Sequence, residues 1–295
     1  MALAVKKLHP LFAAEVRGLD LTRAIDGETA REIDAIMNEY AVAVLPGQLI
    51  DDEQQIRFTR SFGTPELAPE IQGVEGWDAA RVRIRHREIF DAGNLDQYGQ
   101  VLTGDAAKRA YSLANRLWHT DSSFRQISAT YSMLSARLVP PVGADTEFAD
   151  TRAAYDDLPA AMKQKLEGLV AEHSIWTSKG KLGGYQPTEE ELRTRLPARH
   201  PVVRRHPGSG RKALFVASHA SHIIGMPVEE GQALLAELIA HATQERYVYR
   251  HRWSVGDLVI WDNRCTMHRA TPFDDKLYPR DARRTTVREA VPSTA

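Results

Sequence analysis

The spacing of turn residues in the second half of the chain limits the possible folds more than any other feature. Short apolar runs follow one another there, with Pro, Gly and other turn residues close together between them. These runs predict strands at 130–139, 146–151, 169–176, 247–253, 257–261 and 284–289, and a hairpin over 202–217. No regular alternation of strands with helices, which a parallel sheet would require, accompanies them. We therefore predict a mainly β fold with flanking helices (α+β), whose core is a double-stranded β-helix, a cupin-like jelly roll.

Helices are predicted where apolar residues recur at helical intervals, which is the case at 26–37, 51–62, 158–169 and 228–243. The stretch 177–200 is polar and rich in turn residues, so no element is predicted there. Between Gly63 and Lys108, Pro and Gly break the periodic patterns, and a loop of this length in a compact domain is usually a functional lid. With 295 residues, 43% of them hydrophobic, the composition suits one large domain. We predict a single domain over 1–295, with a lid at about 64–110.

Charge and the absence of export signals narrow the possible partners. The chain carries 38 Lys and Arg against 39 Asp and Glu, so its electrostatics favour neither nucleic acid nor an anionic membrane surface. No run of about 18 apolar residues occurs, and the first residues lack the apolar core of a secretory signal. We predict a cytoplasmic protein whose partner is a small molecule, and the sequence leaves a homo-oligomer open. The single cysteine, Cys265, excludes an internal disulfide and a multi-thiolate metal site.

Two short apolar runs end in candidate metal ligands. His119 and Asp121 follow Leu117 and Trp118, and on a strand their side chains would leave from one face. His268 lies at the end of a second run that begins at Leu258. Two imidazoles and one carboxylate form the facial set that holds Fe(II) while leaving coordination sites open for oxygen and a co-substrate. A His-x-Asp pair is weak evidence on its own, because it arises by chance in a chain of this composition.

Four motifs, two of which contain the candidate metal ligands, resemble those of one known family. They are Trp118-His119-x-Asp121-Ser-Ser, Gly143-x-Asp-Thr146-Glu-Phe, Trp261-Asp-Asn-Arg-x-x-x-His268-Arg and Arg280-x-x-x-Arg284. In this order they resemble the Fe(II)/2-oxoglutarate-dependent dioxygenases of the TauD/TfdA family, over nearly the whole chain. His219-Ala-Ser-His222-x-x-Gly-x-Pro and Tyr249-Arg-His-Arg-Trp resemble, within that family, the branch that acts on 2,4-dichlorophenoxyacetate.

The resemblance implies a role for each motif residue. It implies that iron is bound by His119, Asp121 and His268, that the distal carboxylate of 2-oxoglutarate is bound by Thr146 and Arg280, and that the substrate is bound by His219, His222 and Arg284. The implied cofactors are Fe(II), 2-oxoglutarate as co-substrate, and O2. A planar guanidinium is the best partner for a buried carboxylate, which agrees with the two arginine roles. The chain departs from the family pattern in a loop at 269–279 that is one residue longer, and in Gln100, where a lysine is expected.

The implied reaction is hydroxylation of a small carboxylic acid. For an aryloxyalkanoate such as 2,4-dichlorophenoxyacetate, hydroxylation beside the ether oxygen gives a hemiacetal that breaks into a phenol and glyoxylate, while 2-oxoglutarate becomes succinate and CO2. The alternative within the family is a taurine or alkylsulfonate dioxygenase. Two alternatives from other classes are a zinc hydrolase with the same three ligands and a non-enzymatic ligand-binding jelly roll.

Overall fold

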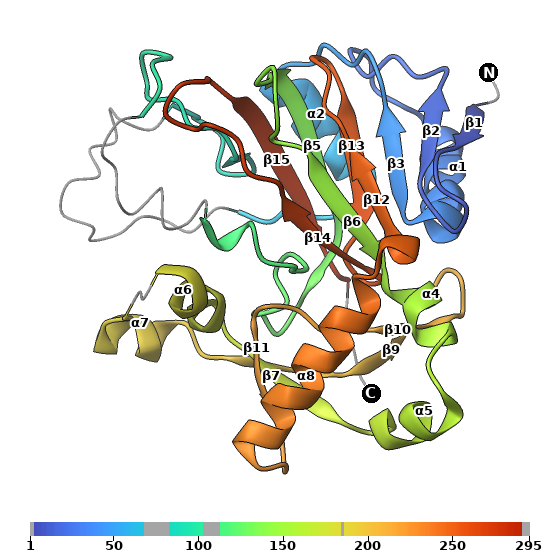
Figure 1. The fold of residues 1–295 in the computed structure, drawn as a ribbon. Coiled ribbons are helices and arrows are strands. Elements are labelled where there is room, and N and C mark those ends of the chain that lie inside the picture. Colours follow the sequence, from blue (N-terminus) through green and yellow to red (C-terminus); the bar gives the residue numbers. More distant parts are fainter. Residues whose placement is uncertain (1–2, 68–82, 103–112, 184–185, 291–295) are drawn as a thin grey trace.

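A seven-stranded sheet forms the centre of the computed structural model, which describes residues 3–67, 83–102, 113–183 and 186–290. Its strands lie in the order β1-β2-β3-β13-β5-β15-β4 (Figure 1). They are β1 (Ala4–Lys7), β2 (Ala14–Arg17), β3 (Val42–Leu45), β13 (Leu258–Asp262), β5 (Ala129–Leu138), β15 (Asp281–Arg288) and β4 (Phe90–Asp91). Neighbouring strands are antiparallel except β2 and β3, which are parallel.

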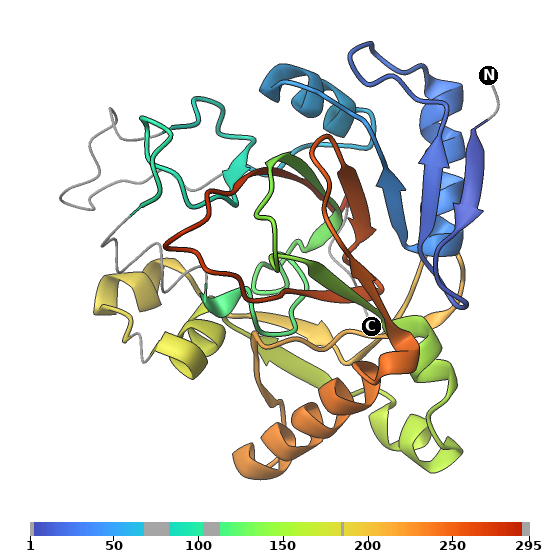
Figure 2. The ribbon, with the colours of Figure 1, turned by 45° about the horizontal axis from the view of Figure 1, so that its top comes forward.

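Three smaller sheets complete the β structure. One has the order β12-β6-β14, from β12 (Val248–His251), β6 (Thr146–Asp150) and β14 (Thr266–Ala270). A second has the order β11-β7-β8, from β11 (Ala220–Ile223), β7 (Val170–His173) and β8 (Ala198–Pro201). The hairpin predicted at 202–217 is confirmed as the antiparallel pair of β9 (Val203–Arg205) and β10 (Lys212–Leu214). Sheets with helices on their outer sides agree with the α+β part of the prediction (Figure 2).

The four predicted helices are all present. They are α1 (Gly27–Tyr40), α2 (Asp52–Arg60), α5 (Ala160–Leu166) and α8 (Val228–Ala242). The first two begin at capping carboxylates, since Asp26 accepts from the N–H of Thr29 and Asp51 forms a capping box with Gln54. Three more helices are α4 (Thr151–Asp156), α6 (Ile175–Gly183) and α7 (Glu189–Thr194), and a 3-10 turn spans Glu245–Tyr247. Within the described residues, no helix combines the length and apolar character needed to cross a bilayer.

The large sheet is buried on both faces. On one face, Met37 of α1 and Phe58 of α2 pack with Met133 and other sheet residues. On the other face, Leu134 and Trp261 pack against Phe148, which belongs to β6 of the smaller sheet. The large sheet and the β12-β6-β14 sheet therefore enclose a shared interior, which is why β3 and β13 are buried along their whole length and β5 along most of its length.

Several predicted boundaries are wrong. The strand predicted at 257–261 matches β13, but the apolar run from Leu258 to His268 is divided by a turn at 263–265, after which β14 begins. The strand predicted at 169–176 ends at His173, and α6 begins at Ile175. The stretch 177–200 holds most of α6 and all of α7, and β15 begins at Asp281, where it pairs with Leu138. Of the predicted lid, residues 68–82 and 103–110 lie outside the described residues.

Candidate metal centre

A backbone bridge joins the two candidate histidine ligands. The N–H of His119 donates to the carbonyl of His268 at 3.0 Å, and the N–H of His268 donates back to the carbonyl of His119 at 2.7 Å. Such a reciprocal pair holds two residues opposite each other, and their imidazole centroids lie 4.1 Å apart. The apolar run before His119 is not a strand, since His119 forms only this isolated bridge and Asp121 lies in the turn that follows.

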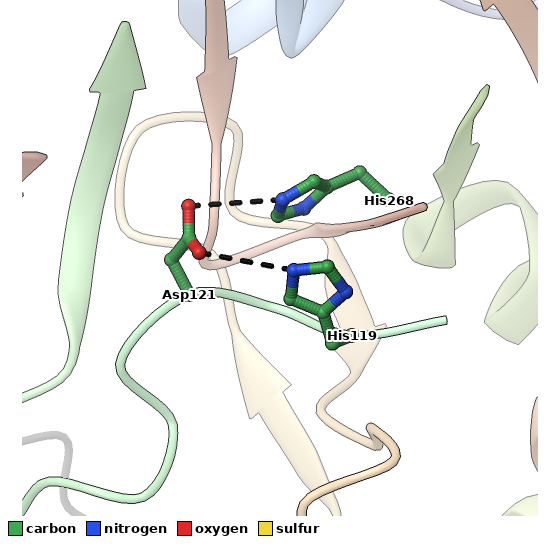
Figure 3. Close-up of side chains that lie close together, drawn as sticks. All are labelled: His119, Asp121 and His268. Atoms are coloured by element: carbon green, nitrogen blue, oxygen red, sulfur yellow. Dashed lines mark ion pairs between the residues drawn. The ribbon is translucent and has the colours of Figure 1, made fainter. Parts of the chain in front are cut away.

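The three side chains converge on one point (Figure 3). The Asp121 carboxylate lies 3.9 Å from Nε2 of His119 and 3.7 Å from Nε2 of His268. All three residues are buried, and their candidate ligand atoms lie within 4.8 Å of one another. Nδ1 of His119 lies 2.8 Å from the Leu117 carbonyl, which only accepts, so Nδ1 carries the proton and the Nε2 lone pair is free to bind a metal. Burial lowers the pKa of both imidazoles, which favours their neutral, metal-binding form.

Asp121 is held as a carboxylate by two donors. Ser132 Oγ donates to one oxygen at 2.7 Å, and Nη1 of Arg284 donates to the other at 2.5 Å. Burial would raise the pKa of Asp121, but the Arg284 guanidinium and the neighbouring imidazoles hold it well below its usual range. The donor set therefore has the composition and protonation that Fe(II) requires, two neutral imidazoles and one ionised carboxylate.

Asn263 fixes the backbone beside Asp121. Its side-chain oxygen accepts from the N–H of Asp121 at 3.1 Å and from the indole N–H of Trp261 at 3.1 Å. Its amide nitrogen donates to Ser132 Oγ at 3.0 Å, and its carbonyl accepts from Thr120 Oγ1 at 2.7 Å. The turn between β13 and β14 thus orients the Asp121 loop through one buried amide. The sequence analysis assigned no role to Asn263 or Ser132, although Asn263 belongs to the Trp261-Asp-Asn-Arg motif.

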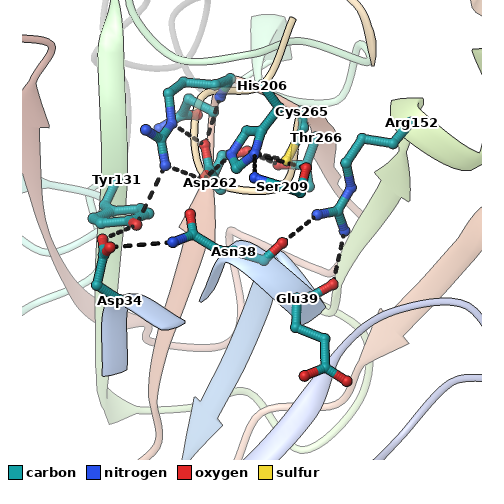
Figure 4. Close-up of polar contacts among 12 residues, drawn as sticks. Asp34, Asn38, Glu39, Tyr131, Arg152, His206, Ser209, Asp262, Cys265 and Thr266 are labelled. Atoms are coloured by element: carbon teal, nitrogen blue, oxygen red, sulfur yellow. Dashed lines mark hydrogen bonds and ion pairs between the residues drawn. The ribbon is translucent and has the colours of Figure 1, made fainter. Parts of the chain in front are cut away.

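Asp262 supports this turn through the contacts of its carboxylate (Figure 4). Its carboxylate accepts from Arg264 Nη2 at 2.6 Å and from His206 Nε2 at 2.9 Å. His206, Asp262 and Cys265 also lie close enough together to hold a metal. Arg264 already neutralises the carboxylate, however, and the N–H of Ser209 occupies Nδ1 of His206 at 3.0 Å. Burial raises the pKa of Cys265, so its sulfur stays a thiol. This second cluster is a hydrogen-bonded support for the turn.

We expect Asn263→Ala to weaken metal binding by about 10- to 100-fold, because partners that orient ligands from outside the coordination sphere typically contribute that much. The variant leaves the Asp121 N–H and the Ser132 hydroxyl without their amide partner. Binding of Mn(II) to metal-free protein, followed by the electron paramagnetic resonance signal of free Mn(II), measures the change. Asn38→Ala is the control, since within the described part of the chain the Asn38 side chain donates only to Asp34 on α1. Equal Mn(II) affinity in wild type and Asn263→Ala would contradict the prediction.

The residues predicted to bind the co-substrate differ in their surroundings. Among the described residues, no acceptor binds the guanidinium of Arg280, while its backbone N–H donates to Asn94 Oδ1 at 2.7 Å. Burial lowers the pKa of Arg280 to about 10, so this cation is desolvated and fits an incoming carboxylate. Thr146 is buried at the start of β6, where its hydroxyl oxygen accepts from Trp253 Nε1 at 3.0 Å, and its own O–H remains a donor. Thr146 and Phe148 are two positions apart on β6, with only Glu147 between them, so both side chains face the interior between the sheets.

The residues predicted to bind the substrate do not all reach the centre. His219 does, because its ring lies edge-on to His119 at 5.9 Å and its Nδ1 bonds Ser123 Oγ at 3.1 Å. Burial lowers the pKa of His219 to about 3. His222 does not line the same pocket, and its Nδ1 bonds Ser221 Oγ at 2.9 Å. Arg284 lines the pocket but donates to Asp121, and Gln100 is exposed outside it.

A pocket opens beside the metal centre, and two of the candidate ligands, His119 and Asp121, line it. Its walls include Phe124 and His219, the Arg284 guanidinium, and one face of α6. The α6 residues in the wall are Ile175, Ser178 and Lys179. The sequence analysis missed them because it predicted no helix at this place. The metal-binding atoms thus lie at the base of a site with apolar and cationic walls, which suits a small organic anion.

Comparison with protein families and curated proteins gives consistent matches. Residues 4–286 match the family described as "Taurine catabolism dioxygenase TauD, TfdA family". The chain is 47% identical to the alpha-ketoglutarate-dependent 2,4-dichlorophenoxyacetate dioxygenase of Cupriavidus pinatubonensis, over 99% of this chain and 100% of that protein. It is 36% identical to the (S)-phenoxypropionate/alpha-ketoglutarate-dioxygenase of Sphingobium herbicidovorans, over 92% and 91% of the two chains. Alpha-ketoglutarate is another name for 2-oxoglutarate.

Solved structures agree. The crystal structure of AAD-2 in complex with Mn(II) and N-oxalylglycine matches with a TM-score of 0.90 and 43% identity, covering 100% of both chains. A taurine dioxygenase from Burkholderia xenovorans matches with a TM-score of 0.75 and 29% identity, covering 98% of this chain and 90% of the other. Between these two structures, both measures are higher for AAD-2.

Proposed function

The chain belongs to the TauD/TfdA family of dioxygenases, and from this premise we propose that it hydroxylates an aryloxyalkanoic acid such as 2,4-dichlorophenoxyacetate and so cleaves its ether bond. It is an Fe(II)- and 2-oxoglutarate-dependent dioxygenase. This membership removes the zinc hydrolase and the non-enzymatic jelly roll as alternatives. The observation that carries the substrate proposal is the 47% identity to a 2,4-dichlorophenoxyacetate dioxygenase over the full length of that relative.

The iron, O2 and 2-oxoglutarate together supply the oxidising chemistry: one oxygen atom enters a substrate C–H bond, and the other enters the succinate formed with CO2. The hydroxylated carbon beside the ether oxygen is a hemiacetal, whose C–O bond breaks to give a phenol and glyoxylate. In our proposal, His119, Asp121 and His268 hold the iron, and Arg284 keeps Asp121 ionised. Trp261, 4.8 Å from the His268 ring, and Phe148 shield that imidazole from water.

We infer that Arg280 binds the distal carboxylate of 2-oxoglutarate, assisted by the Thr146 hydroxyl. The desolvated guanidinium of Arg280 supports this role, because an anion would offset the free-energy cost of its burial. Burial lowers the pKa of His219 to about 3, so its imidazole is neutral at pH 7. A neutral imidazole can form a hydrogen bond with a substrate oxygen without placing a second positive charge beside the iron. His222 does not line the pocket, so it could affect substrate binding only by positioning residues that do.

We also infer that the two facing sheets form the predicted double-stranded β-helix, and that the whole chain is one domain. The described part of 64–110 supports its role as a lid. Phe90 places its ring 4.7 Å from the Arg284 guanidinium, and Asn94 holds the backbone of Arg280. This segment therefore contacts both arginines that the site is proposed to use.

The substrate proposal is tested by following phenol release and succinate formation together. We expect 2,4-dichlorophenoxyacetate and 2-phenoxypropionates to give about one succinate per phenol, with neither product formed when 2-oxoglutarate is omitted. Taurine and alkyl sulfonates are assayed in parallel, since the family also contains taurine dioxygenases. Coupled turnover of a sulfonate, with none of any aryloxy acid, would replace the proposed substrate class by sulfonates.

A further inference from the structure

We propose that Gly93 and Asn94 form a positioning unit for Arg280, which sets where its guanidinium meets the distal carboxylate of 2-oxoglutarate. This rests on the proposed function, in which Arg280 binds that carboxylate, and adds the residues that give the arginine its place. Three features of the structure carry the inference: the backbone partner of Arg280, the loop that leads to it, and the close approach of Gly93.

Asn94 bonds both backbone groups of Arg280. Arg280 lies just before β15, whose pairing with β5 begins at Asp281 and Leu138. The N–H of Arg280 donates to Asn94 Oδ1 at 2.7 Å, and the N–H of Asn94 donates back to the Arg280 carbonyl at 3.1 Å. One residue therefore fixes the main chain from which the arginine side chain extends.

The Asn94 side chain also holds the loop that leads to Arg280. This connection between β14 and β15 spans residues 271–280. Nδ2 of Asn94 donates to the carbonyl of Asp275 at 2.8 Å and to that of Tyr278 at 2.9 Å. With Oδ1 bonded to the Arg280 N–H, the amide uses its acceptor and both of its donor hydrogens on this one connection. An aspartate would instead place a negative oxygen against two carbonyls.

Gly93 allows the two segments to lie this close together. A Cβ at position 93 would lie 2.5 Å from the carbonyl oxygen of Arg280, so the two backbones would have to separate. The N–H of Gly93 donates to Asp91 Oδ1 at 2.9 Å. Arg83 pairs with Asp91 at 2.7 Å and with Asp281 at 2.8 Å, which ties this segment to the residue that follows Arg280.

The placement of Arg280 matters because of the way a guanidinium binds a carboxylate. Its planar fork forms two parallel hydrogen bonds only when it meets the anion in one geometry. Among the described residues, no acceptor holds the Arg280 guanidinium, so its position depends on the backbone that carries it. Releasing that backbone should weaken a 2-oxo acid that has a distal carboxylate, and should leave one that lacks it unchanged.

The alternative is that Gly93 and Asn94 serve only to keep the surrounding loops folded. The two cases differ in one quantity, the preference of the protein for 2-oxoglutarate over 2-oxobutyrate. 2-Oxobutyrate keeps the 2-oxo acid group but has no distal carboxylate. A positioning unit for Arg280 contributes to that preference, whereas a general loosening of the site would weaken both ligands equally.

The test measures the dissociation constants of both 2-oxo acids by calorimetry in protein loaded with Mn(II). We expect Asn94→Ala and Gly93→Ala each to weaken 2-oxoglutarate about 5- to 50-fold, below the roughly 100-fold that a misplacement of about 1 Å can cost, and to leave 2-oxobutyrate within about twofold. Asn94→Asp should resemble Asn94→Ala, since it loses both donors. Asn38→Ala and Gly27→Ala are the matched controls, because the Asn38 amide donates to Asp34 on α1 and a Cβ at Gly27 meets open space.

An unchanged preference for 2-oxoglutarate in both Asn94→Ala and Gly93→Ala overturns the inference, and so does an equal loss of both ligands. Arg280→Ala is measured alongside, to separate this inference from the proposed function. If Arg280→Ala lowers the preference and neither neighbouring variant does, Arg280 keeps its proposed role and only the positioning unit fails. If Arg280→Ala also leaves the preference unchanged, the proposed role of Arg280 fails with it.

Discussion

Asp121→Asn and His119→Ala should each reduce turnover to below about 1% of wild type, since even partners outside the coordination sphere typically contribute 10- to 100-fold. Asp121→Asn keeps the shape of the side chain but removes the charge that faces Arg284 and both imidazoles. Asp121→Ala would add a second effect, because it leaves the Arg284 guanidinium without its anion and so also lowers stability. Asparagine therefore isolates the loss of the metal ligand.

Succinate formation with substrate present measures the loss of activity, and Mn(II) binding to metal-free protein measures the loss of the site. The circular dichroism spectrum should stay unchanged. Asp156→Asn is the control for removing a carboxylate, because Asp156 is exposed and, among the residues that the structure describes, its carboxylate pairs only with Arg211, 2.6 Å away. Full activity in either centre variant would show that the three residues do not hold the iron.

Arg280→Ala should raise the concentration of 2-oxoglutarate needed for half-maximal rate about 10- to 100-fold. Removing one charge-assisted contact typically costs about 1.5–3 kcal/mol of binding free energy. The guanidinium is desolvated and has no acceptor among the described residues, so its burial is unfavourable until an anion arrives. Arg280→Lys should recover only part of the affinity, since an ammonium lacks the planar fork that matches a carboxylate.

The melting temperature tests the same prediction independently of activity, because the substitution should change it differently with and without 2-oxoglutarate. Without 2-oxoglutarate, Arg280→Ala should melt at or above the wild-type temperature, because a half-buried cation with no acceptor among the described residues is removed. With 2-oxoglutarate, wild type should gain stability by mass action and the variant should gain little. An unchanged requirement in Arg280→Ala would move the role to another arginine. The candidates would be Arg283 and Arg284 on β15, each of which is paired with a carboxylate in this structure, Arg283 with Asp281 at 2.8 Å and Arg284 with Asp121.

The elements that the sequence predicted correctly are those with strong local signals. Asp26 and Asp51 cap α1 and α2 as their residue types predict, and the turn at 207–210 closes the predicted hairpin. Helix α6 was missed because its sequence, Ile-Trp-Thr-Ser-Lys-Gly-Lys-Leu-Gly, has two glycines and no clear apolar stripe. Its contacts with the backbone at Ser218 and His219 are tertiary, and no local pattern reports them.

The same distinction applies to the site. The three metal ligands were identifiable because their residue types are chemically special and their motifs are shared with a family. Asn263 and Ser132 were not assigned, since an amide and a hydroxyl gain their role here only from being placed within 3.0 Å of each other by two different strands and a turn. The partner of Arg284 could not be predicted either, because position 284 meets Asp121 only once β15 lies beside β5.

The reciprocal backbone pair of His119 and His268 also governs how chimeras of such enzymes can be built. The two segments that carry these ligands should be transplanted together, because the backbone of each supplies the hydrogen bonds that position the other. The backbone of Asp121 is also bonded to Asn263, in the turn that precedes β14. Segments 114–124 and 262–268 therefore form one exchangeable unit. Helix α6 is attached differently, through bonds to the main chain at Ser218 and His219. It can be swapped between relatives as a separate cassette, which would let the pocket wall diverge while the iron centre is inherited intact.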